Sequence, residues 1–133
     1  MYHTSAEKFL CSPSAKRYRG KVQLIFTSPP FPLNRKKAYD NFQGSEYIEW
    51  LASFASLFVQ FLKPDGSIVM EMGNAWEPGR PVMSTLALEA LLGFLWQGKL
   101  NLVQQFICYN PARLPSPAQR TPRPGYRRDS LRR

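Results

Sequence analysis

The segment Thr27-Ser28-Pro29-Pro30-Phe31 groups residue types that could do chemistry on a planar base. Ser28 offers a hydroxyl, the next residues offer backbone carbonyls, and Phe31 offers an aromatic face. Because proline has no backbone N–H, the segment presents hydrogen-bond acceptors and almost no donors. Acceptors favour a more reactive, tetrahedral nitrogen in an exocyclic amino group, and the ring could stack on a base flipped out of a duplex. A proline-rich turn without chemistry is the other interpretation, since short motifs often match by chance.

The apolar run at residues 22–26 must position this segment. Its length and residue types predict a buried strand. Pro29 and Pro30 end the strand, because neither can donate to a sheet ladder and each favours an extended residue before it. The segment is therefore expected to be a stiff loop at the carboxyl end of a strand, where open α/β sheets place their ligands.

The elements that follow predict a parallel βαβ unit. Residues 45–62 have an aromatic stripe at helical spacing, with Ser45 as the expected N-cap, and we interpret that stripe as core rather than as a cofactor site. Residues 63–66 predict a turn and residues 67–72 a second buried strand. A strand, a helix and a strand in this order favour a right-handed parallel unit.

The remaining elements are shorter or less regular. Residues 3–10 predict a short helix, and residues 12–20 a polar, basic connection. Residues 84–95 predict a helix with an apolar stripe of Leu88, Leu91, Leu92 and Leu95. Residues 100–109 predict a third strand, with residues 102–103 and 106–107 buried. Residues 118–133 contain almost no apolar residues, so we expect a basic, disordered tail after a domain at 1–117.

Composition limits the classes of protein to which the chain can belong. A length of 133 residues with 44% hydrophobic residues suits one small domain with a core. Cys11 and Cys108 follow no metal-ligand pattern and are interpreted as free thiols in a reducing compartment. His3 is the only histidine, so we expect no metal site. The start of the chain does not resemble a signal peptide and no run is long enough to span a bilayer, which favours a cytoplasmic protein without a membrane partner.

The net charge of +9 is unevenly distributed. Residues 1–37 carry eight Lys/Arg and one acid (+7), residues 38–112 carry three and seven (−4), and residues 113–133 carry seven and one (+6). The first basic block surrounds the proline loop, and a polyanion such as DNA is the natural partner. Arg35, Lys36 and Lys37 could meet phosphates beside a target base or could be ordinary exposed loop residues. For the tail alone, a solvated, disordered segment is the better interpretation.

A second proline-stiffened loop supports a family resemblance. It reads Asn110-Pro111-Ala112-Arg113-Leu114-Pro115-Ser116-Pro117. With Thr27-Ser28-Pro29-Pro30-Phe31 and Leu62-Lys63-Pro64-Asp65-Gly66-Ser67, it resembles cytosine-N4 DNA methyltransferases of type II restriction–modification systems, of the PvuII type. The resemblance covers roughly residues 20–117, and the two proline motifs in the right order make it specific.

The resemblance implies a fold, a substrate and a cofactor. The fold is a partial Rossmann-like methyltransferase fold of the α/β class with a mostly parallel sheet. The substrate is a flipped cytosine in double-stranded DNA, and the methyl donor is S-adenosylmethionine. By resemblance, Ser28 and the Pro29 carbonyl bond the target amino group, Pro30 belongs to the same motif, and Phe31 stacks on the base. The loop with Asn110, Pro111 and Arg113 helps to close the base pocket.

The chain also departs from the family. No Phe-x-Gly-x-Gly cofactor loop occurs in the sequence, and Thr4-Ser5 stands where the family often has Gly-Asp. Of the cofactor-binding residues, only Ser28 can be suggested. We therefore expect the catalytic half of a methyltransferase, active alone or with a missing cofactor-binding half or second subunit. The alternative is a remnant without catalysis that acts at most as a basic nucleic-acid-binding module.

Overall fold

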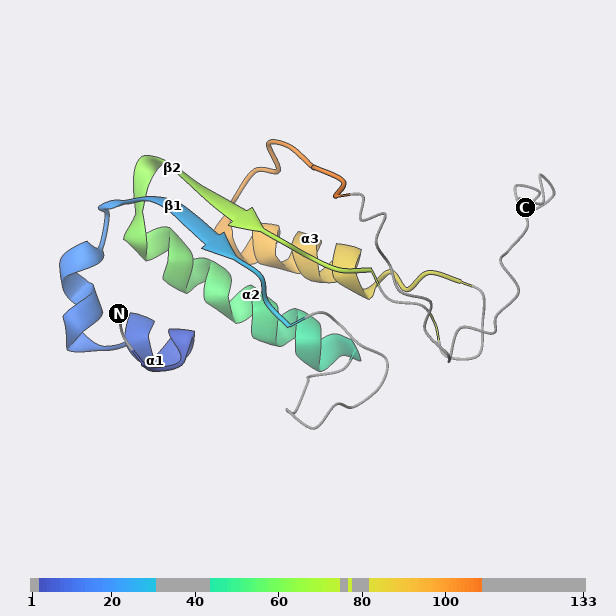
Figure 1. The fold of residues 1–133 in the computed structure, drawn as a ribbon, viewed down its shortest axis with the longest axis horizontal. Coiled ribbons are helices and arrows are strands. Elements are labelled where there is room, and N and C mark those ends of the chain that lie inside the picture. The colour runs from blue at the N-terminus through green and yellow to red at the C-terminus, as the bar shows by residue number, and fades with distance from the viewer. Residues whose placement is uncertain (1–2, 31–43, 75–76, 78–81, 109–133) are drawn as a thin grey trace.

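The structure, a computed structural model, describes residues 3–30, 44–74, 77 and 82–108. Figure 1 shows a short N-terminal helical region, two adjacent strands and two longer helices. In chain order the elements are α1 (Ala6–Leu10), the 3₁₀ helix η1 (Pro13–Tyr18), β1 (Val22–Thr27), α2 (Gly44–Phe61), β2 (Leu62–Met70) and α3 (Leu86–Gly98). None of the helices in these described ranges is long and apolar enough to cross a membrane.

The predicted parallel βαβ unit is confirmed by β1, α2 and β2. The two strands pair in parallel, with Ile25 opposite Ile68 and Thr27 opposite Met70. Their carboxyl ends therefore lie side by side, as the prediction of a ligand site at that edge requires. Helix α2 begins at Gly44, one residue before the expected cap Ser45, and runs directly into β2.

The predicted turn at residues 63–66 is instead an irregularity inside β2. Val22 pairs with Leu62, but Leu24 pairs with Ser67, so one intervening residue of β1 faces four of β2. The Gln23 side-chain amide donates a hydrogen bond to the Asp65 carbonyl at 3.0 Å. The Pro-Asp-Gly sequence, which is typical of turns, thus lies in an irregular part of a strand rather than before one.

The hydrophobic core lies between the two long helices and one face of the sheet. Ile25 and Ile68 pack against this core, whereas Leu24, Phe26 and Val69, on the alternate positions, are exposed. The buried members are Tyr47, Leu51, Phe54, Ala55, Phe58, Leu86, Ala90 and Phe94. The prediction that the aromatic stripe of residues 45–62 is core is therefore confirmed for its buried members.

The prediction of which α3 residues face the core is wrong. Leu88 and Leu92 are 46% and 45% exposed, and Leu91 and Leu95 are half-buried. The buried side of the helix instead consists of Leu86, Ala87, Ala90 and Phe94. This side thus combines two large side chains with two alanines, and the Phe94 ring contacts the Phe58 ring of α2 with centroids 6.1 Å apart. The helix also begins and ends later than predicted, at Leu86 and Gly98.

The predicted third strand is not formed in its described part, residues 100–108. Its apolar side chains, expected to be buried, are exposed: Leu102 57%, Val103 93%, Phe106 74% and Ile107 91%. A strand depends on neighbours for both its hydrogen bonds and its burial. No described residue pairs with this segment, so β propensity alone does not make it a strand.

Candidate active site

The candidate site begins where β1 ends. The backbone N–H of Glu71, just after β2, donates to the Thr27 carbonyl oxygen at 2.9 Å. Beyond Thr27 the two prolines cannot donate to a ladder, so the chain leaves the sheet as predicted. Pro29 is buried, whereas Ser28 and Pro30 are exposed. The sequence therefore builds a short segment that is anchored at one end and accessible at the other.

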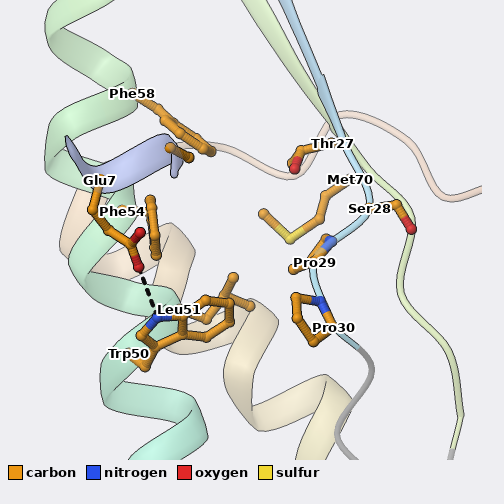
Figure 2. A pocket seen from close by; sticks show the side chains of 11 residues that line it. Glu7, Thr27, Ser28, Pro29, Pro30, Trp50, Leu51, Phe54, Phe58 and Met70 are labelled. Carbon is orange, nitrogen blue, oxygen red and sulfur yellow. Dashed lines mark hydrogen bonds between the residues drawn. The ribbon is translucent and has the colours of Figure 1, made fainter. Parts of the chain in front are cut away.

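A pocket of about 200 Å³ lies against this segment. It is bounded by α1, the end of β1, one side of α2 and the last residue of β2, as Figure 2 shows. In that view Pro29, Pro30 and Met70 face the aromatic rings, whereas the Ser28 hydroxyl points away from them. The lining residues are Ala6, Glu7, Thr27, Ser28, Pro29, Pro30, Trp50, Leu51, Phe54, Phe58 and Met70.

The aromatic wall of the pocket comes from one face of α2. Trp50, Phe54 and Phe58 follow one another at the four-residue spacing that places side chains on one side of a helix. The centroids of Trp50 and Phe54 are 5.3 Å apart at an interplanar angle of 77°, and those of Phe54 and Phe58 are 5.7 Å apart. These edge-to-face and tilted contacts stabilise the stack and present ring faces to neighbouring groups.

Glu7 contributes the charge of the pocket. Helix α1 is capped by the Ser5 hydroxyl, which accepts a hydrogen bond from the Lys8 backbone N–H at 3.4 Å. The indole Nε1 of Trp50 donates to Oε1 of Glu7 at 3.4 Å, which links α1 to α2 across 43 residues of sequence (Figure 2). The polar side chains of the lining include the Thr27 and Ser28 hydroxyls, which can donate or accept a hydrogen bond, and the Glu7 carboxylate, which accepts.

The structure brings together part of the predicted site. Ser28, Pro29 and Pro30 lie at the end of β1 and line the pocket, as expected from their position in the sequence. The other predicted residues lie outside the described residues: Phe31, Arg35, Lys36, Lys37, Asn110, Pro111 and Arg113. The predicted tail at 118–133 lies outside them too.

Sequence reasoning missed seven residues of the pocket: Ala6, Glu7, Trp50, Leu51, Phe54, Phe58 and Met70. We interpreted the apolar and aromatic stripe of α2 as core only, and four of its members also line the pocket. The signal available was the βαβ topology, which places the first half of α2 beneath the strand ends. Nothing local in the sequence joins Glu7 to this site.

Part of the basic block lies away from the loop. Lys16 and Arg17 on η1, followed by Arg19 and Lys21, are exposed and precede β1. At about 3.3 Å per residue, the six residues of β1 separate them from Ser28 by roughly 20 Å. These four cations thus lie at the opposite end of β1 from the pocket, whereas the exposed Lys8 lies on α1, next to Glu7 in the sequence.

The described part of the chain contains no group of three or more His, Cys, Asp or Glu side chains that could hold a metal ion. Cys11 and Cys108 are both exposed and unpaired with each other.

Comparisons with known proteins show what the chain is similar to. A family model described as DNA methylase (N6_N4_Mtase) matches residues 22–128. The Type II methyltransferase M.PvuII of Proteus hauseri is 40% identical over 98 residues, which are 74% of this chain and 29% of that protein. A solved structure titled PvuII DNA methyltransferase (cytosine-N4-specific) is 39% identical, with a TM-score of 0.62 over 75% of this chain and 36% of that one. The chain thus spans about a third of the length of these relatives.

Proposed function

The chain belongs to the DNA methylase family, and on that premise we propose that its pocket is part of the methyl-transfer site of a cytosine-N4 DNA methyltransferase. The observation that carries the proposal is the placement of Ser28-Pro29-Pro30 at the end of β1, on the rim of an acceptor-rich, aromatic pocket. The specificity for cytosine N4 is taken from the solved PvuII DNA methyltransferase, which is 39% identical to the matched part of this chain. The family model's match at residues 22–128 includes the loop.

The residues of the loop have separate tasks in the proposed reaction. The Ser28 hydroxyl is exposed and can accept a hydrogen bond from an amino group of a base outside the duplex. The Pro29 carbonyl oxygen can accept a hydrogen bond from the second amino N–H. Two acceptors fix the direction of the nitrogen lone pair and favour the pyramidal geometry that the nitrogen adopts as it reacts. Phe31 is proposed, from its sequence position, to stack on the base.

The proposed methyl donor is S-adenosylmethionine. When bound, it would supply the methyl group, with a nitrogen–carbon bond replacing the carbon–sulfur bond and a neutral thioether as the leaving group. The amino nitrogen would release one proton to solvent. The pocket suits such a ligand because its rings, its carboxylate and its acceptor oxygens can surround a cationic, hydrogen-bond-donating molecule. Since the sequence contains no Phe-x-Gly-x-Gly segment, we propose that further groups holding the donor come from outside these 133 residues.

The proposed partner is double-stranded DNA. Arg35, Lys36 and Lys37 follow the loop directly and are proposed to contact phosphates beside the flipped base. Asn110, Pro111 and Arg113 are proposed to close the base pocket from the second proline loop. These assignments rest on sequence position and on the family resemblance.

The proposal is tested by Ser28→Ala, with Ser67→Ala as the matched control. Both serines are exposed, and Ser67 lies in β2 away from the pocket. We expect Ser28→Ala to lower methyl incorporation into duplex DNA by about 10²-fold, the order of loss for one preorganised transition-state hydrogen bond, and Ser67→Ala to retain it. The assay uses the chain alone and with the remainder of M.PvuII supplied as a second chain. Full activity of Ser28→Ala would show that the site is wrongly assigned.

A second candidate function is binding to nucleic acid without catalysis. The exposed group Lys16, Arg17, Arg19 and Lys21 favours it, because these residues form a cationic surface separate from the pocket. This function needs no methyl donor. If it is the function of the chain, Ser28→Ala should leave the affinity for DNA unchanged.

A further inference from the structure

Helix α3 is apolar on nearly all sides, with Glu89 as its one charged residue. One side of the helix packs into the core beside α2 (Figure 1). The opposite side is apolar as well but exposed: Leu88 and Leu92 are exposed, and Trp96 is 76% exposed. A surface helix normally turns polar residues away from the core, whereas a helix that is apolar all round is normally buried. The outward side of α3 therefore has the composition of an interface rather than of a free surface.

Four residues of this outward side follow the spacing of a seam between two helices. Glu89, Leu92, Trp96 and Lys99 recur at alternating intervals of three and four residues, which places them in one row along the helix. Glu89 lies in the first turn of α3, where its carboxylate accepts a hydrogen bond from the Thr85 hydroxyl. Lys99 follows the last helical residue, and its side chain is exposed. The row is thus apolar in its middle and oppositely charged at its two ends.

We propose that this row is a docking surface for a second copy of the chain, with the two α3 helices antiparallel about a two-fold axis. In one antiparallel register, Leu92 lies opposite Trp96 of the second copy. In that same register, Glu89 lies opposite Lys99 of the second copy. The two-fold axis repeats every contact, so this register pairs both apolar residues and both charges of each copy. A parallel arrangement would instead place like charges side by side, which disfavours it.

The charges of the row also favour a protein partner over a lipid surface. A helix that lies on a membrane carries Lys and Arg beside its apolar side and is attracted to anionic lipids. The row has one acid, Glu89, and one base, Lys99, so its net charge is zero. Because the row is complementary to itself, a second copy fits it without any further feature.

The contact is short, so the association should be weak. Helix α3 has 13 residues, which at 1.5 Å per residue make about 20 Å of helix. Trp96 should contribute much of the affinity, since tryptophan is enriched among the residues that dominate interfaces. We expect a monomer–dimer equilibrium with a dissociation constant of about 1–100 µM.

Sedimentation equilibrium of the full chain, at concentrations up to about 1 mM, measures this association. Trp96→Ala should raise the dissociation constant by at least about 30-fold, the size expected for truncation of one dominant interface residue. Because the Trp96 side chain is mostly exposed, the circular dichroism spectrum of the variant should match that of wild type.

Phe26→Ala is the matched control, since Phe26 is an exposed aromatic residue of β1 rather than of α3. It should keep the wild-type dissociation constant. Glu89→Lys should raise the constant by about three- to tenfold, because it replaces attraction by repulsion at both ends of the contact. The double variant Glu89→Lys/Lys99→Glu should restore the wild-type value, which a loss of helix stability would not do.

A wild-type chain that stays monomeric up to about 1 mM would overturn the proposal. A dimer that Trp96→Ala leaves intact, or that Phe26→Ala dissociates, would place the contact elsewhere and overturn it too. Failure of the double variant to restore association would overturn the antiparallel register. These outcomes do not bear on the proposed methyl-transfer site, because no residue of the row lines the pocket.

Discussion

The Thr27 carbonyl oxygen accepts a hydrogen bond from the Glu71 backbone N–H at 2.9 Å, at the point where both strands end. Thr27 is also the register partner of Met70. This bond fixes the last residue before the Ser-Pro-Pro segment, and the prolines then prevent the ladder from continuing. The loop is therefore held at its base by the sheet, while Ser28 stays accessible to a substrate.

Gly66 should tolerate no side chain. A Cβ atom there would lie 3.0 Å from the carbonyl oxygens of Lys63 and Val22, which are backbone atoms of both strands. We expect Gly66→Ala to lower the free energy of unfolding by about 1–3 kcal/mol, as overpacking of a well-packed site does. Denaturant unfolding measures the change, with Ser67→Ala at the next, exposed position as control. Wild-type stability in Gly66→Ala would contradict the close approach.

Tyr47 is buried at 2% exposure, and its hydroxyl has no hydrogen-bond partner among the described residues. Burying an unpaired hydroxyl costs free energy, while the ring itself belongs to the core. Tyr47→Phe keeps the ring and removes the hydroxyl. We expect it to raise the free energy of unfolding by about 1 kcal/mol in denaturant titrations at pH 7. A loss of more than about 1 kcal/mol would indicate that the hydroxyl is paired.

The same residue should make stability depend on alkaline pH. Burial raises the pKa of Tyr47 from 10.0 to about 12. Between these values the unfolded chain has released the phenol proton and the folded chain has kept it, so the unfolded state gains stability as the pH rises. The stability that depends on the protonated Tyr47 phenol is complete below pH 10 and is lost between pH 10 and about 12. The free energy of unfolding, measured across this pH range, should fall less steeply in Tyr47→Phe than in wild type. Parallel curves of this free energy against pH for the two proteins would contradict a buried phenol.

The cationic surface before β1 predicts salt-dependent DNA binding. Each phosphate contact adds about 0.9 to the slope of log affinity against log salt concentration for duplex DNA. We expect the double variant Lys16→Ala/Lys21→Ala to reduce that slope by about 1–2, whereas Lys99→Ala, at the end of α3, leaves it unchanged. Filter binding at several salt concentrations gives the slope. Binding that does not respond to salt would rule out this surface as a DNA contact.

Local sequence signals predicted the elements that can be identified from the residue types of a short segment alone. The strand before Thr27, the helix with residues 47–58 and the proline-stiffened loop each follow from residue types within a short window. Their arrangement followed from the handedness and connection rules of parallel strands. The position of Ser28 at a strand end was therefore predictable.

The features that depend on distant partners were not predictable. The Glu7–Trp50 contact joins residues 43 apart and has no local signature. Val103 and Ile107 have the residue types of a buried strand but lie exposed, because no described neighbour pairs with them. In α3, Ala90 rather than Leu88 faces the core, because the way the helix is rotated against its neighbours decides which side is buried.

Identification of the methylated nucleoside tests the central claim most directly. Duplex DNA is incubated with S-adenosylmethionine carrying a labelled methyl group and with the chain, alone and with the remainder of M.PvuII as a second chain, and is then digested for mass spectrometry. We expect labelled N4-methylcytosine with wild type and a loss of about 10²-fold with Ser28→Ala. Label in another nucleoside, or no label in any duplex under either condition, would contradict a cytosine-N4 methyl-transfer site at Ser28-Pro29-Pro30.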